Sequence, residues 1–84
     1  NQIRYCYQRE LQKDQDLAGK LVVGFVIAPD GTVTSARVES TSLNNPVLES
    51  CVVARFKRMK FEPPAGGGVV IVRYPIVFSV AEET

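Results

Sequence analysis

Few residues of the chain have the types and spacing that an active site requires. None of the 84 residues is a histidine, and the two cysteines, Cys6 and Cys51, lie far apart in the sequence. A zinc site needs about four nitrogen or sulfur ligands, and a nucleophilic serine or cysteine needs a neighbouring base, most often histidine. The sequence therefore predicts neither a metal site nor a nucleophilic enzyme.

The carboxylates are scattered along the chain instead of paired. Asp30 belongs to a turn, and Glu49 to the first turn of a predicted helix. Glu10 lies on the apolar stripe of another predicted helix, where pairing with a nearby basic side chain would account for it. No general acid and base pair stands out. We expect no enzymatic activity, no catalytic residue and no cofactor.

Two further motifs suggest binding, and each has a simpler explanation. Basic residues gather near the end of the second predicted helix: Arg55, Lys57, Arg58 and Lys60. They could bind phosphate or an acidic partner, but cations also stabilise a helix C-terminus. The run Gly66–Gly68 lacks the preceding strand and the following Lys-Ser/Thr of a phosphate-binding loop. The net charge of +1 does not suggest a nucleic-acid partner.

The two cysteines leave three interpretations open: a disulfide, two buried free thiols, or a reactive thiol. Cys6 and Cys51 both lie on the inward stripes of predicted helices. If the helices pack side by side on one face of a sheet, a disulfide is geometrically reasonable. It would stabilise the fold by ~4 kcal/mol in the chain-entropy model. A short chain with a modest core benefits from such a link, so the disulfide is favoured.

The elements that position these residues follow from the hydrophobic periodicity. Pro29-Asp30-Gly31 is a strong turn signal between two strands. Asn45 and Pro46 fit the N-cap and first position of a helix, which Pro63-Pro64 cannot continue. The predicted elements are a helix over 2–13, strands over 20–28 and 32–41, a helix over 46–60 and a strand over 69–80.

Three finer features concern packing. The strand over 20–28 is apolar on both faces, which predicts a central strand. The inward residues Val33 and Ala36 are three apart, which predicts a bulge near Thr34 and Ser35. The apolar stripe of the second helix is predicted to comprise Val47, Leu48, Cys51, Val52, Phe56 and Met59.

The final strand is the most informative segment. Every second residue from Val70 to Val80 is apolar, as in a strand with one buried face. A long final strand is a candidate for a sheet edge, which offers unpaired backbone groups to another chain. Pro75 lacks an N–H, so it supports an edge and interrupts any ladder formed there; it could equally serve to limit promiscuous pairing. We expect partner pairing along Val69, Val70, Ile71, Val72 and Arg73.

Two stretches resemble the TonB C-terminal domain family. Residues 19–33 are similar to its first hairpin. Residues 55–64, with the glycines and long strand that follow, are similar to its second helix, Phe-x-Pro exit and final strand. The resemblance covers residues 17–80. The cysteine pair, the three glycines and Tyr74-Pro75 further resemble the AgmX/PglI-type branch found in myxobacterial envelope and gliding-motility proteins.

The resemblance implies a fold. Family topology places the first strand in the middle and the other two at the edges, parallel to one another and joined by a crossover of the less common hand. We therefore predict a single α+β domain over residues 1–84, like the C-terminal domains of TonB and TolA. It is a two-layer α/β sandwich of α-β-β-α-β order, with two helices on one face of a three-stranded, antiparallel-type sheet.

The resemblance also implies a function. Family members couple a proton-driven motor in the inner membrane to an outer-membrane protein, pairing their last strand with a segment of that partner. We expect a periplasmic domain of an inner-membrane-anchored protein, with its anchor and extended linker upstream, that acts in transport or gliding motility. The alternative is a static periplasmic scaffold or cell-wall-binding module. Pro75 and the cysteine pair depart from the general pattern of the family.

A second contact surface is also predicted on the sheet. Apolar residues on the far face, Val22, Val26, Ile71 and Val77, could extend the partner contact or meet a second copy of the chain. The partners expected are therefore an outer-membrane or periplasmic protein at the sheet edge, an inner-membrane motor through upstream regions, and a second copy in a homodimer.

Overall fold

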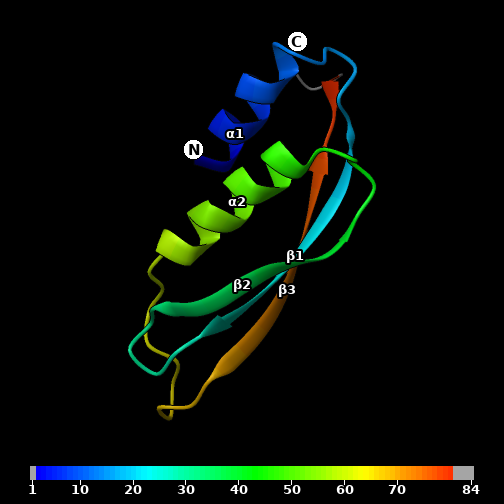
Figure 1. The fold of residues 1–84 in the computed structure, drawn as a ribbon. Helices are drawn as coiled ribbons and strands as arrows, with labels where there is room; N and C mark the ends of the chain where they lie inside the picture. Colours follow the sequence, from blue (N-terminus) through cyan, green and yellow to red (C-terminus); the bar gives the residue numbers. More distant parts are fainter. Residues whose placement is uncertain (1, 81–84) are drawn as a thin grey trace.

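The apolar strand over residues 19–27 lies at the centre of the sheet, as its two apolar faces predict. The computed structural model describes residues 2–80. Its elements are α1 (Gln2–Leu11), β1 (Gly19–Ile27), β2 (Val33–Thr41), α2 (Pro46–Arg58) and β3 (Val70–Phe78). The strands form one sheet in the order β2-β1-β3, and β1 is antiparallel to both neighbours. Both helices lie on one face (Figure 1), so the predicted fold class is confirmed.

The helices end earlier than their sequence patterns indicate. After Leu11 the N–H groups of Lys13 and Asp14 both donate to the carbonyl of Glu10, at 3.0 Å, which closes α1 with a turn. The backbone of Met59 is extended and ends α2 at Arg58. At the start of α2, the Asn45 side chain accepts a hydrogen bond of 2.9 Å from the Leu48 N–H, as an N-cap does.

The chain leaving α2 is tied to the turn between β1 and β2. The N–H of Phe61 donates to the carbonyl of Gly31 at 2.8 Å, and Lys60 forms an isolated bridge with Thr32. Gly31 has a φ of +91°, and an added Cβ would collide with the carbonyl oxygen of Phe61. A glycine is therefore needed at this turn both for its backbone angle and for the close approach of the helix exit.

The core lies between the sheet and the two helices. It combines β1 residues with the stripe of α2, the inner face of α1 and two loop residues that the periodicity did not indicate, Leu17 and Leu43. The prediction that Val47 belongs to the α2 stripe is wrong, because its side chain is 52% exposed. Leu48, Val52 and Phe56 hold the centre of the stripe, and Val47 lies outside it. Among residues 2–80, the largest fully buried side chains are Cys6, Leu21, Val23, Leu48 and Val52.

Strand β2 is irregular where the sequence breaks period two. Ser35 pairs with Val26 and Val33 with Ile27, so Thr34 is an extra residue, and the bulge predicted near Thr34 and Ser35 is confirmed. A second irregularity, which no pattern indicated, lies at Glu39, between Ser40 and Val38 in the pairing. The edge formed by β2 is thus bent at both ends.

Candidate interaction edge and groove

β3 forms a long, regular sheet edge. Its pairing with β1 runs without interruption from Gly19–Phe78 to Ile27–Val70. In the part of the chain that the structure describes, no strand pairs with the other side of β3. The opposite edge, β2, carries both register irregularities of the sheet. Since bulges and bends hinder the addition of another strand, β3 is the edge better suited to pairing.

The direction of the β3 backbone groups follows from the hydrogen bonds of β1. The carbonyl of Lys20 accepts from Ser42 at 3.0 Å and the N–H of Ala28 donates to Thr32 at 2.7 Å, so even-numbered residues of β1 point toward β2. Alternate residues of an antiparallel pair point in opposite directions. Pro75, opposite Val22, therefore directs its nitrogen to the open edge, together with the backbone of Ile71, Arg73 and Val77.

The predicted partner-binding residues fall into two groups along this edge. Ile71 and Arg73 direct their backbone groups outward, whereas Val70 and Val72 direct theirs toward β1. Val69 precedes the strand and is 60% exposed, and the Ile71 side chain is 78% exposed on the face without helices. The absence of an N–H at Pro75 leaves a gap in the open edge between Arg73 and Val77.

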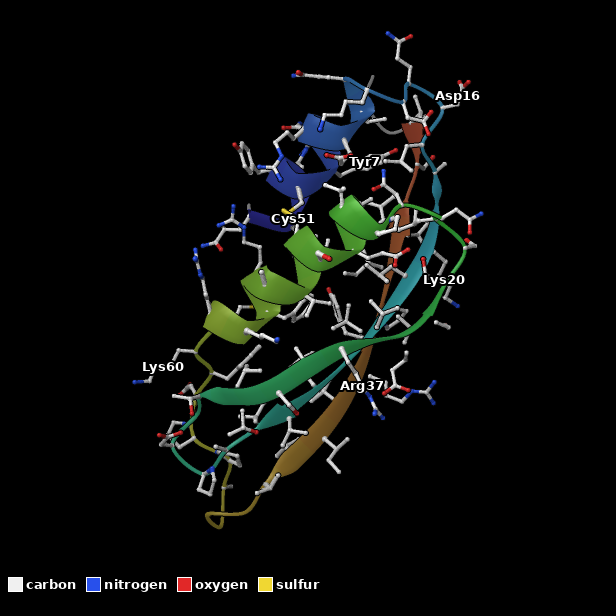
Figure 2. All side chains as sticks on the ribbon, viewed as in Figure 1. Tyr7, Asp16, Lys20, Arg37, Cys51 and Lys60 are labelled. Carbon is white, nitrogen blue, oxygen red and sulfur yellow. A yellow bond between two sulfur atoms is a disulfide. The ribbon has the colours of Figure 1, made fainter. Side chains whose placement is uncertain are left out.

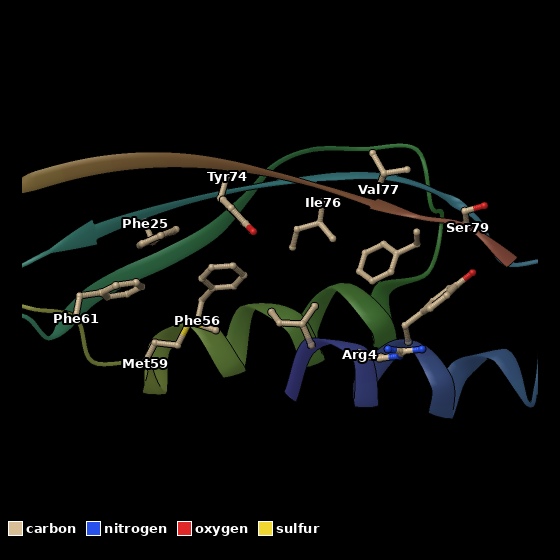
Figure 3. A pocket seen from close by; sticks show the side chains of 12 residues that line it. Arg4, Phe25, Phe56, Met59, Phe61, Tyr74, Ile76, Val77 and Ser79 are labelled. Atoms are coloured by element: carbon tan, nitrogen blue, oxygen red, sulfur yellow. The ribbon is translucent and has the colours of Figure 1, made fainter. Parts of the chain in front are cut away.

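A groove lies beneath β3, on the helix side of the sheet. It encloses about 610 Å³ and is lined by residues of β3, β1, both helices and the chain leaving α2 (Figure 3). Tyr74, on the helix-facing side of β3, is still 52% exposed, which shows that the helices do not cover this strand along its whole length. The sequence pattern marks Tyr74 as an inward residue and so misses the groove.

Aromatic side chains form one wall of this groove. The ring centroids of Phe61 and Phe25 are 5.6 Å apart, those of Phe25 and Phe56 5.0 Å, and those of Phe56 and Tyr74 5.9 Å. These separations are typical of favourable aromatic pairs. Four rings from β1, α2, the helix exit and β3 thus form a continuous apolar surface that leads to the edge strand.

A disulfide joins the two helices. The sulfur atoms of Cys6 and Cys51 are 2.04 Å apart, so the favoured interpretation of the cysteines is confirmed; Figure 2 labels Cys51 at this link. Glu10, nearby on α1, is buried and lies 3.6 Å from the ammonium of Lys13, the basic partner that its position suggested. It also accepts a hydrogen bond of 3.4 Å from Asn45 at the start of α2.

The basic residues near the end of α2 do not form one site. The Arg55 guanidinium lies 5.8 Å from the ring centroid of Tyr5, and that of Arg9 lies 5.7 Å from the same ring. Lys60 instead belongs to the extended exit beside Thr32 (Figure 2). Among residues 2–80, no group of three or more His, Cys, Asp or Glu side chains is placed to hold a metal ion.

Comparison with known proteins identifies the family. A model of the Gram-negative bacterial TonB protein C-terminal matches residues 9–80. The chain belongs to the TonB C-terminal domain family. The NMR structure of the TonB C-terminal domain of Helicobacter pylori has the same fold, with a TM-score of 0.65 and 20% identity over 93% of this chain and 77% of that one. No curated protein sequence matches the chain significantly.

Membership of the TonB family sets the general role. TonB C-terminal domains are periplasmic interaction modules of Gram-negative bacteria, and they contact outer-membrane proteins. Within residues 2–80, neither α1 nor α2 is long and apolar enough to cross a membrane. The open edge of β3 and the groove beneath it are the features of this TonB-like domain best suited to an interaction.

Proposed function

We propose that this domain is the partner-binding end of an inner-membrane-anchored TonB-like protein. It transmits proton-motive energy or force to an outer-membrane protein by pairing β3 with an extended strand of that partner. The observation that supports this most is the open edge, with backbone groups of Ile71 and Arg73 directed away from β1. Pairing begins before Pro75 and uses the segment from Val69 to Arg73.

The backbone hydrogen bonds between β3 and a partner strand contribute only a modest binding free energy. A backbone hydrogen bond contributes about 0.5–1.5 kcal/mol net, and Pro75 removes one donor from the open side. A short ladder on Ile71 and Arg73 is therefore weak and reversible unless side chains add to it. β3 runs along the long dimension of the molecule, which measures 44 × 22 × 19 Å (Figure 1). A force along that direction acts on all the backbone hydrogen bonds between β3 and the partner strand at the same time.

Gliding motility is the process that we propose for the whole protein. The proposal follows the resemblance of the cysteine pair, the glycine run and Tyr74-Pro75 to the AgmX/PglI-type branch. The disulfide between Cys6 and Cys51 suits an oxidising compartment such as the periplasm. Under the alternative, a static scaffold or cell-wall-binding module, the same edge would bind without transmitting energy.

Site-specific photo-crosslinking in living cells tests this function. A photoreactive amino acid replaces Ile71 or Arg73 on the β3 edge, and Arg37 on β2 serves as the matched control. The β3 positions should yield an adduct with an outer-membrane protein. In the protein labelled at Ile71, Arg73→Pro, which removes one outward N–H, should abolish the adduct. A proton uncoupler should change the yield. Adducts that form equally well from the β2 position would overturn the proposal. An adduct whose yield the uncoupler does not change would favour the static scaffold. An adduct with a second copy of the chain would indicate a homodimer.

A further inference from the structure

We propose that the groove beneath β3 receives large apolar or aromatic side chains from alternate positions of the strand that pairs with the β3 edge. This inference rests on the proposed strand pairing and assigns it a specificity: the partner segment carries such a residue at every second position. The backbone groups of Ile71 and Arg73 then bind the backbone of the partner strand, and the groove selects partner strands by their side chains.

The position of the groove relative to the edge requires this arrangement. A strand added to β3 lies about 4.8 Å away in the plane of the sheet. Its residues opposite Val72, Tyr74 and Ile76 share the helix-facing side with them. That side is the mouth of the groove, because Tyr74 and Ile76 line it. Every second side chain of the added strand therefore projects into the space between β3 and the helices.

The chemistry of the lining specifies the kind of side chain. Phe25, Phe56, Phe61 and Tyr74 form the aromatic wall, and Ile3, Met59 and Ile76 complete the apolar surface. A volume of about 610 Å³ is that of a site for a drug-sized ligand, so more than one large side chain fits. Arg4 also lines the groove (Figure 3). Since an uncompensated charge in an apolar environment is costly and a cation would meet the Arg4 guanidinium, lysine and arginine at these positions are selected against.

Pro75 links the groove to the open edge. It lies between Tyr74 and Ile76, so the gap in the backbone donors coincides with the part of β3 that lines the groove. A partner strand that continues past Arg73 finds no N–H donor at residue 75, where only the carbonyl can form a hydrogen bond. Side-chain burial in the groove offsets that loss. The two features together favour strands with apolar alternation over arbitrary extended chains.

The inference is tested by selecting phage-displayed random linear peptides that bind the folded domain. Calorimetry then measures the dissociation constants of the enriched peptides. Enriched sequences should carry apolar or aromatic residues at every second position. Ile76→Trp, which fills the groove, should weaken their binding at least about tenfold, because burying one large apolar side chain is worth more than that. Val47→Trp adds the same ring to an exposed position of α2, which belongs to neither the groove nor the β3 edge, and should change binding less than about twofold. Met59→Trp fills the groove from the helix side if Ile76→Trp does not fold.

Arg73→Pro separates this inference from the proposed function. In the wild type the N–H of Arg73 points to the open edge and forms no hydrogen bond with β1. The Arg73→Pro variant should therefore fold but no longer bind the enriched peptides. If it does, but both groove-filling variants bind like the wild type, strand pairing stands and the groove proposal is overturned. Enrichment of no peptide, or of peptides without alternating apolar residues, overturns it as well. If Arg73→Pro binds unchanged, the pairing on which the inference rests is what fails.

Discussion

The carboxylate of Glu39 lies directly over Gly24 on the face of the sheet that carries no helix. Its Oε2 is 3.1 Å from Nε of Arg37 on β2, and its Oε1 is 4.0 Å from Nε of Arg73 on β3. A Cβ at residue 24 would lie 2.8 Å from Cγ of Glu39. Glu39 is also the extra residue of the second bulge, so the side chain that occupies the space left by the glycine in β1 comes from the bulge in β2.

Gly24→Ala should lower the free energy of unfolding by up to about 1 kcal/mol, since the added methyl displaces the Glu39 side chain and both exposed ion pairs. In a Glu39→Ala background the same change should be neutral or stabilising by about 0.5–1 kcal/mol, because alanine suits a strand better than glycine. Urea denaturation of the four proteins in this cycle gives the coupling. An equal cost in both backgrounds would show that Glu39 is not the reason for the glycine.

Removing the disulfide should lower the free energy of unfolding considerably more than Gly24→Ala does. The variant Cys6→Ala/Cys51→Ala loses a link between residues 45 apart in sequence, for which the chain-entropy model gives about 4 kcal/mol. Denaturation with and without a reducing agent measures this, and the reductant should leave the double variant unchanged. If thiol labelling of the unreduced, unfolded wild type modifies both cysteines, the disulfide is absent.

The hydroxyl of Tyr7 anchors α1 to the loop before β1. It donates a buried hydrogen bond of 2.6 Å to the carbonyl of Leu17, and its ring lies 4.8 Å from that of Phe78. Tyr7→Phe keeps the ring contact and should destabilise the domain by about 1–2 kcal/mol, because the buried carbonyl loses its donor. Tyr5→Phe is the control on the exposed side of α1 and should cost less than about 0.5 kcal/mol. Thermal denaturation that finds equal costs would contradict this role.

The sequence predicts the elements whose periodicity and boundary residues agree. The Pro29-Asp30-Gly31 turn, the Asn45 cap and the cysteines on facing stripes all lie where local chemistry indicates. The Thr34 bulge is predictable because apolar residues flank it on the inward face. The irregularity at Glu39 is not, because the residues that Glu39 meets across the sheet, Gly24 and Arg73, are far away in sequence and leave no periodic signal along β2.

The groove is the part of the candidate site that the sequence could not reveal. Alternation along β3 marks Tyr74 and Phe78 alike as inward residues, yet Tyr74 is 52% exposed and Phe78 only 6%. Their difference depends on where the helices end over the sheet. The same limit explains Val47, since an apolar stripe read on a helix is wider than the face that a neighbouring strand covers.

Asp30 provides a pH-dependent probe of the β1–β2 turn. Hydrogen bonds from the Thr32 hydroxyl, at 2.7 Å, and from its backbone N–H, at 3.0 Å, hold the pKa of Asp30 below its ordinary value. A carboxyl whose pKa is lower in the folded state stabilises the fold above its unfolded pKa, and this contribution is lost as the pH falls through the folded pKa. Thr32→Val removes the larger cause, so the pKa of Asp30 should rise. NMR titration of the Asp30 carboxyl measures it, with Thr34→Val as a control that should leave it unchanged.

Pro75→Val tests what limits pairing at the β3 edge. The change adds an N–H that points away from β1, and it should alter the unfolding free energy by less than about 1 kcal/mol because no bond to β1 is gained or lost. Self-association in sedimentation experiments should increase, since an uninterrupted edge is a better template for another strand. Pro63→Val, on the exposed chain leaving α2, removes a proline without completing an edge and should stay like the wild type. A Pro75→Val protein that neither associates nor binds extended peptides more tightly would mean that the missing N–H at residue 75 does not restrict pairing at this edge.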